Sequence, residues 1–294
     1  MKYLEKHPMI MIVVGIMGIS LSAIFVKYAQ APSTVTAAWR LLWTVVLMTP
    51  VVLGKGEVRR ELFHLDRKTL ILSALSGLFL AIHFVLWFES LKHTSVASST
   101  AIVCTEVIWV CIGFCLLLKG RLSRKAMLAI AITLVGSLLI AYADSFTGGS
   151  HLRGDILALV AAIAVAAYTL IGRWVRAKVS TSVYTYVVYV SCVAVLLVSV
   201  LVQGYNVLGY GFSPVLVGLL LSVFSTILGH SIFSWCLKFL SPSFVSASKL
   251  CEPVVAAIMA AFLFGEMPVP LQIVGGAMII GGVLFYSRLE SEGA

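Results

Sequence analysis

Two glutamates near the middle of long apolar stretches are the first residues in this chain that could do chemistry. Glu106 and Glu252 lie 146 positions apart in a sequence of 294 residues. A carboxylate at the mid-depth of a lipid bilayer costs about 2.5–3.5 kcal/mol on insertion scales, so residues of this kind generally serve a function. A buried carboxylate can pair with a cation or exchange a proton. Both glutamates are therefore predicted site residues and predicted proton-coupling residues.

The residues beside Glu252 suggest how its charge is balanced. Lys249 and Glu252 have i, i+3 spacing, which puts them on one helical face where they can pair. Pro253 removes the helical hydrogen bond to the carbonyl of Lys249 and so frees one more acceptor. Two interpretations stay open. The pair neutralises itself and merely survives burial, or substrate and protons compete for the carboxylate.

Glu106 has no basic residue within four positions on its own helix, so its partner must come from elsewhere. Arg40, in the second apolar run, is the candidate. It serves either as a fixed tie between helices or as part of a binding site. Without a partner, burial favours the protonated carboxyl group, and Glu106 is then the stronger candidate for proton coupling. Trp109 shares a face with Glu106 at i, i+3 and is a further candidate for substrate binding.

Imidazole and aromatic rings also recur at helical spacing. His83 and Trp87 share a face at i, i+4, as do His230 and Phe233 at i, i+3. Each histidine could be a hydrogen-bonded packing residue, but their near-matching places in the two halves favour a cavity wall. We predict a central cavity formed by the third, fourth, eighth and ninth apolar runs. The predicted substrate-binding residues are His83, Trp87, Glu106, Trp109, His230, Phe233, Lys249, Glu252 and Arg40.

The composition of the chain predicts that membrane-spanning helices position these residues. The chain is 61% hydrophobic and only 11% charged, whereas soluble domains carry about 25% charged residues. A membrane-spanning helix needs about 20 apolar residues. Ten runs qualify, at about 9–30, 34–53, 69–90, 94–118, 124–143, 154–175, 182–203, 213–237, 244–264 and 269–288. The short gaps leave no room for a soluble domain, and the continuous runs exclude an outer-membrane barrel.

The sequence gives no sign of an enzyme, a metal site or a cofactor. It contains no GxSxG, HExxH or Walker A motif. The missing P-loop also removes ATP as a direct energy source. All six cysteines lie in apolar runs and none forms a CxxC pair, so we interpret them as small packing residues. No catalytic residue is predicted.

The net charge of +9 is distributed as in membrane proteins rather than as in nucleic-acid-binding ones. Most lysines and arginines fall at the two chain ends or in every second gap between apolar runs. The opposite gaps hold little more than Lys92 and Arg153. This bias predicts a multi-pass protein of the cell inner membrane with both termini in the cytoplasm. The first apolar run is long and lacks an obvious cleavage site, so we expect it to be the first span.

The two halves of the chain match at an offset of 146 positions. At this offset Glu106 falls on Glu252 and Trp87 on Phe233, while His83 lies one residue from the position of His230. Each half holds five spans. Because five is odd, the second half enters the membrane from the opposite side, which predicts inverted repeats. We place the first repeat at residues 1–148 and the second at 149–294.

Several segments resemble a known family. The segments HFVLWFESLKHTSVASSTAIV (83–103), AAWRLLWT (37–44) and GHSIFSWCLKFLSPSFVSASKLCEPVVAAIMAAFLFGEMPVPLQIVGGAMIIGGVLF (229–285) are similar to the EamA branch of the drug/metabolite transporter superfamily. This resemblance implies a ten-span transporter, most commonly an exporter of amino acids or other metabolites. One position departs from the pattern, because the branch usually has proline in the middle of both the fourth and ninth spans. Here Val107 follows Glu106, so a mechanism that needs two matched helix breaks is not expected.

The fold class expected is therefore an all-α integral membrane protein of ten transmembrane helices in two inverted five-helix repeats. The function expected is secondary active transport by alternating access, with proton-coupled export as one form. The solute is a small amino acid, amine or similar zwitterionic or cationic metabolite. Alternatives are a non-transporting or receptor-like bundle, or a transporter of drug-like or lipid-precursor solutes. The expected partners are the small-molecule substrate and membrane lipid, without nucleic acid or cofactor, in a monomer or homodimer.

Overall fold

The computed structural model describes residues 7–94, 96–145, 152–264 and 269–292. Throughout these ranges the chain is helical and contains no strand. The elements are α2 (Pro8–Ser20), α3 (Ser22–Lys27), α4 (Ser33–Gly54), α5 (Gly56–Phe63), α6 (Arg67–Ser90), α7 (Val96–Cys104), α8 (Glu106–Leu116), α9 (Arg124–Ser145), α10 (Leu152–Arg176), α11 (Thr181–Val202), α12 (Ser213–Leu220), the π-helix η1 (Leu221–Ser231), α13 (Ile232–Cys236), α14 (Pro242–Ser248), the 3-10 turn η2 (Lys249–Cys251), α15 (Glu252–Phe264) and α16 (Pro270–Glu292).

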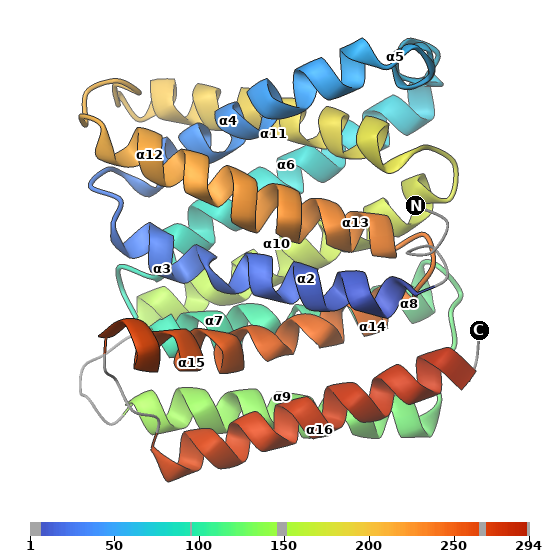
Figure 1. Ribbon diagram of the computed structural model, residues 1–294, viewed down its shortest axis with the longest axis vertical. Coiled ribbons are helices and arrows are strands. Elements are labelled where there is room, and N and C mark those ends of the chain that lie inside the picture. The colour runs from blue at the N-terminus through green and yellow to red at the C-terminus, as the bar shows by residue number, and fades with distance from the viewer. Residues whose placement is uncertain (1–6, 95, 146–151, 265–268, 293–294) are drawn as a thin grey trace.

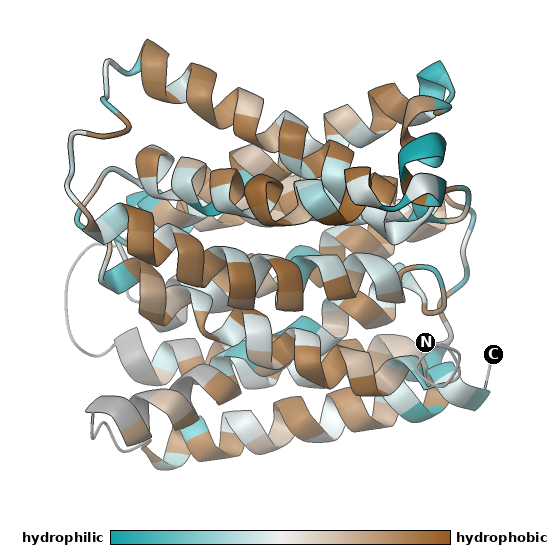
Figure 2. Ribbon diagram, turned by 45° about the horizontal axis from the view of Figure 1, so that its top comes forward, coloured by the Kyte–Doolittle hydropathy of each residue, from teal (hydrophilic) through white to brown (hydrophobic). Residues whose placement is uncertain are grey.

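These elements join end to end into ten rods, which confirms the predicted fold class. Eight rods in the described part of the chain are long and apolar enough to cross a membrane. The other two are α9, as the fifth rod, and α14–η2–α15, as the ninth. Figure 2 shows hydrophobic segments along most of the helices and hydrophilic ones gathered mainly at their ends. The short amphipathic helix α5 lies between the second and third rods.

The rods form two inverted copies of one arrangement. The fourth rod (α7 then α8) and the ninth (α14 then α15) run in opposite directions, and both chain termini lie at the same end of the bundle (Figure 1). Packing follows the same symmetry. The third rod packs on the sixth as the eighth packs on the first, and the fourth packs on the sixth as the ninth packs on the first. The proposed boundary between residues 148 and 149 lies outside the described residues.

The fifth and tenth rods pair with each other at one side of the bundle (Figure 1). They cross where Gly136 meets Gly275. A Cβ atom built on either glycine would lie 2.6 Å from the carbonyl oxygen of the other. Small residues of this kind let membrane helices approach closely. The two helices can therefore approach this closely only because Gly136 and Gly275 have no side chains.

The fourth rod is interrupted beside Glu106, and this corrects the expectation drawn from Val107. Thr105 separates α7 from α8, and its hydroxyl donates to the carbonyl oxygen of Ile102 at 2.6 Å. Its backbone N–H donates to the same carbonyl at 3.0 Å. This hydrogen bond spans three residues instead of the four of an α-helix, so the backbone turns more tightly here. Threonine hydroxyls compete for backbone carbonyls in this way. The ninth rod is interrupted by η2 at the matching place, so both repeats break their helix next to the glutamate.

Candidate functional site

A small cavity lies at the centre of the bundle, where the two repeats meet. Six rods line it rather than the four predicted, because the first and sixth contribute as well. The lining residues are Ile19, Ser22, His83, Trp87, Val103, Cys104, Glu106, Val165, His230, Lys249 and Glu252. The cavity volume is about 40 Å³, which is room for a few water molecules. Ligand pockets usually measure about 300–1,000 Å³, so the cavity is contracted in this conformation.

An ion pair crosses the cavity between the two repeats. The Nζ atom of Lys249 lies 2.8 Å from Oε1 of Glu106, and the two side chains are 9% and 3% exposed. The Nζ atom also lies 5.4 Å from the ring centre of Phe233, within range of a cation–π contact. Both pairings predicted from sequence are therefore wrong. Lys249 does not bind Glu252, the acid on its own rod, because a carboxylate on the facing rod takes its charge.

Glu252 lines the cavity and is 9% exposed, and within the described ranges its carboxyl group forms no hydrogen bond or ion pair shorter than 4 Å. The carbonyl that Pro253 was expected to free does find donors. It accepts the backbone N–H of Glu252 in the 3-10 turn, and the Sγ atom of Cys104 lies 3.8 Å from it. The cavity thus contains two carboxyl groups and one lysine. Within this lining Glu252 is the carboxyl group without a directly paired cation, and the charge of the buried Arg40 acts on it from beyond the cavity wall.

Two histidines and a tryptophan form the aromatic wall of the cavity. His83 stacks on Trp87 with ring centres 6.0 Å apart and planes inclined by 12°. His230 meets His83 edge to face at 6.3 Å, so rings from the two repeats touch. The Nδ1 atom of His83 lies 3.1 Å from the carbonyl oxygen of Ala161. Nδ1 of His230 and Nε1 of Trp87 are buried without a hydrogen-bond partner in the described structure.

Arg40 lies behind the cavity wall rather than in it. Its side chain is fully buried, and its Nε donates to Oγ1 of Thr226 at 2.7 Å. A second nitrogen donates to Oγ of the cavity residue Ser22 at 3.2 Å, and the guanidinium lies 4.1 Å from the ring centre of Phe84. The predicted tie to Glu106 is absent. Arg40 instead joins the second rod to the first through Ser22 and to the eighth through Thr226, which belongs to the π-helix η1.

Two further predicted residues lie outside the lining of the cavity. Phe233 is 3% exposed, and its ring makes the cation–π contact with Lys249. Trp109 is half-buried and does not contribute to the lining. Conversely, the contribution of Ser22 and Val165 was missed. Ser22 gave a weak signal as a hydroxyl in an apolar run, but Val165 cannot be told from a packing residue by its type.

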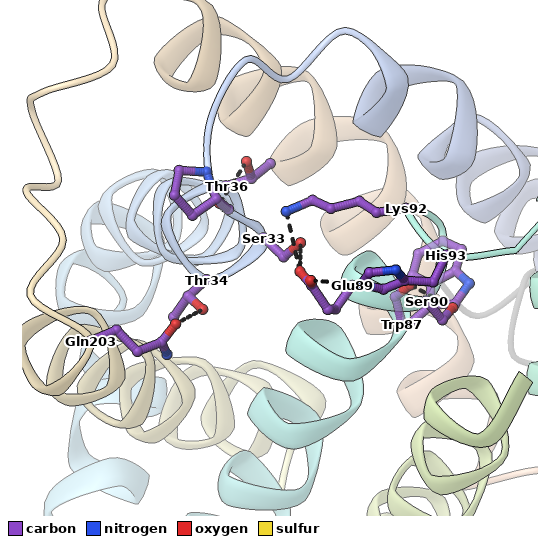
Figure 3. A network of polar contacts seen from close by, with 10 residues as sticks. Ser33, Thr34, Thr36, Trp87, Glu89, Ser90, Lys92, His93 and Gln203 are labelled. Carbon is purple, nitrogen blue, oxygen red and sulfur yellow. Dashed lines mark hydrogen bonds and ion pairs between the residues drawn. The ribbon is translucent and has the colours of Figure 1, made fainter. Parts of the chain in front are cut away.

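A polar network joins the beginning of α4 to the end of α6 (Figure 3). Oε2 of Glu89 accepts from Oγ of Ser33 at 2.9 Å and pairs with Nζ of Lys92 at 3.1 Å. Nε2 of His93 lies 3.3 Å from the other carboxylate oxygen. Glu89 and Lys92 thus form a surface ion pair, and the bond from Ser33 to Glu89 also ties the second rod to the third. A hollow of about 180 Å³ lies beside it, lined in part by Ser33 and Lys92.

Inverted repeats of membrane helices around a charged central cavity are the architecture of a secondary transporter. The EamA-like transporter family matches the chain twice, over residues 7–142 and 152–288, and the chain belongs to this family. The uncharacterized transporter YyaM of Bacillus subtilis (strain 168) is 24% identical over 264 residues, which cover 86% of this chain and 84% of the relative. The uncharacterized transporter YxxF of the same organism is also 24% identical, over 267 residues covering 88% and 82%. A crystal structure with a TM-score of 0.79 and 16% identity covers 98% of both chains and supports the fold.

Proposed function

We propose that this EamA-type transporter moves a small metabolite bearing an ammonium group, such as an amine or an amino acid. The charge balance of the cavity carries the proposal, since two carboxyl groups face one lysine. A solute ammonium beside Glu252 would supply the missing positive charge. Stacked His83 and Trp87 would add a ring surface for a cation. Because Arg40 lies outside the cavity, a solute carboxylate would depend on Lys249, and this favours an amine over an anion.

We infer that transport proceeds by alternating access. A cavity of about 40 Å³ cannot hold an amino acid, so the six lining rods would have to separate for the solute to enter. The helix interruptions at Thr105 and at η2 lie beside the two glutamates. Backbone that departs from regular helix is where large changes in φ and ψ are most easily absorbed. In this proposal the half-rods on either side of each interruption, α7 and α8 in the fourth rod and α14 and α15 in the ninth, move as rigid units.

We further propose that Glu252 carries the coupling proton. The sequence argument favoured Glu106 because Lys249 was expected to hold Glu252 ionised, but Lys249 pairs with Glu106. By the same reasoning Glu252 is the carboxyl group free to exchange a proton. A proton and a cationic solute that compete for one carboxylate travel in opposite directions. Protons entering the cell would then drive export across the inner membrane, with both termini in the cytoplasm.

The test of this function is flux into liposomes. A panel of amines and amino acids is first screened for ligands that raise the melting temperature of the purified protein. Each one found is then measured as a labelled solute against an imposed pH gradient. We expect saturable uptake into liposomes with an acidic interior. A ligand that raises the melting temperature without crossing the membrane would favour a receptor-like bundle, while responses limited to drug-like or lipid-precursor solutes would contradict the proposed solute class.

A further inference from the structure

A second hollow lies on the outer surface of the bundle and shares no lining residue with the central cavity. It measures about 310 Å³ and is lined by Lys68, Leu72, Leu117, Leu118, Leu170, Ile171 and Trp174. These residues come from the beginning of α6, the turn that follows α8 and the last turns of α10. The hollow is therefore a groove between three rods, and apart from Lys68 its lining is apolar. Leu117 is 74% exposed at its edge.

The mouth of this groove carries two ammonium groups. The Nζ atom of Lys178 lies 3.8 Å from the ring centre of Trp174, and that of Lys68 lies 5.0 Å from it. Both lysines are exposed. Two acids lie near the groove mouth. Asp66 caps α6 by accepting the backbone N–H of Thr69 at 3.0 Å, and Glu61 accepts the backbone N–H of Ser180 at 2.6 Å. Both carboxylates are engaged by backbone N–H groups, and within the described residues neither forms an ion pair with Lys68 or Lys178.

The groove lies where the polar and apolar parts of a membrane meet. It is at the end of the bundle that holds both chain termini, because α6 begins there and α10 ends there. Tryptophan and lysine at rod ends are typical of the level of the lipid headgroups. Most gaps rich in lysine and arginine are at this end as well, which places it at the leaflet where anionic lipids concentrate.

We propose that this groove is a binding site for an anionic phospholipid. An acyl chain would lie along the five leucine and isoleucine side chains, and the headgroup phosphate would lie between Lys68 and Lys178. A zwitterionic headgroup would bring its own cation against the two ammonium groups and bind less well. Basic pockets between membrane helices on the cytoplasmic side recognise anionic headgroups in this way. A free phosphate ion would leave the apolar groove unused, so the site selects the lipid.

The site can be tested with Trp174 as the reporter. The protein is reconstituted in nanodiscs with brominated phosphatidylglycerol or brominated phosphatidylcholine, and the quenched fluorescence that disappears in Trp174→Phe is assigned to this groove. We expect phosphatidylglycerol to quench preferentially. Each lysine near a charged membrane surface contributes about fivefold in binding. Replacing both in Lys68→Gln/Lys178→Gln should therefore weaken the preference by about thirtyfold.

Lys238→Gln provides the matched control. Lys238 lies at the same end of the bundle and its Nζ is 5.8 Å from the ring centre of Phe239, but this lysine does not line the groove. Its removal should leave the preference unchanged, and inorganic phosphate at constant ionic strength should not displace the lipid. Equal quenching by the two lipids would overturn the proposal. So would a Lys238→Gln effect as large as that of the double variant, or displacement by phosphate alone.

Discussion

Lys249 and Glu106 join the two repeats through a buried ion pair with a separation of 2.8 Å. Lys249 is the first residue of η2, which interrupts the ninth rod, and Glu106 directly follows the interruption of the fourth rod at Thr105. Any motion that separates these rods must break the pair or replace one partner. In the proposed function, a solute ammonium would compete with Lys249 for Glu106, and Glu252 lines the same cavity. The pair is thus placed to respond to the solute.

Removing one partner of this pair should destabilise the protein. Glu106→Gln leaves the ammonium group of Lys249 buried without its partner, and breaking a buried pair in this way costs about 3–5 kcal/mol. Because Glu252 can take over part of the charge, we expect a loss near the lower value. A double-mutant cycle with Lys249→Met measures the coupling from unfolding in detergent. The double variant should lose less than the sum of the single losses, and simple additivity would show that the two residues do not interact.

The crossing of the fifth and tenth rods should tolerate no added methyl group. In Gly275→Ala the new Cβ would lie 2.6 Å from the carbonyl oxygen of Gly136, so the helices must move apart. Overpacking of this kind typically costs about 1–3 kcal/mol. Gly281→Ala on the same helix is the matched control, because nothing lies within 4 Å of its Cβ position. Melting temperatures of the two variants should differ clearly, and an equal effect would refute the close approach.

The topology can be checked by labelling single introduced cysteines with a membrane-impermeant reagent in intact cells. A cysteine at Asn206, between α11 and α12, should react from outside. A cysteine at Ser123, just before α9, should react only after the cells are opened. Cys115 is exposed and is replaced by serine in the background protein. Labelling of both or neither site in intact cells would contradict the inverted arrangement with cytoplasmic termini.

The ten rods were predictable because runs of about 20 apolar residues report membrane spans directly. The inverted duplication was predictable from Glu106 and Glu252, whose common offset does not depend on side-chain contacts. The pairing of Glu106 with Lys249 was not, because spacing along one helix identifies only neighbours on that helix. The break at Thr105 was missed for a related reason. A proline in the sequence predicts an interruption of the helix. A threonine does not, because its hydroxyl also bonds to backbone carbonyls within unbroken helices.

The central claim is that Glu252 is the carboxyl group shared by solute and proton, and Glu252→Gln in liposomes tests it most directly. The control is Glu57→Gln, which removes an exposed acid on α5 outside the cavity. With the solute identified by the melting-temperature screen, uptake is measured with and without a pH gradient. We predict that Glu57→Gln behaves as the unaltered protein, while Glu252→Gln stays folded and loses gradient-driven accumulation. Full gradient-driven accumulation by a well-folded Glu252→Gln protein would contradict the account.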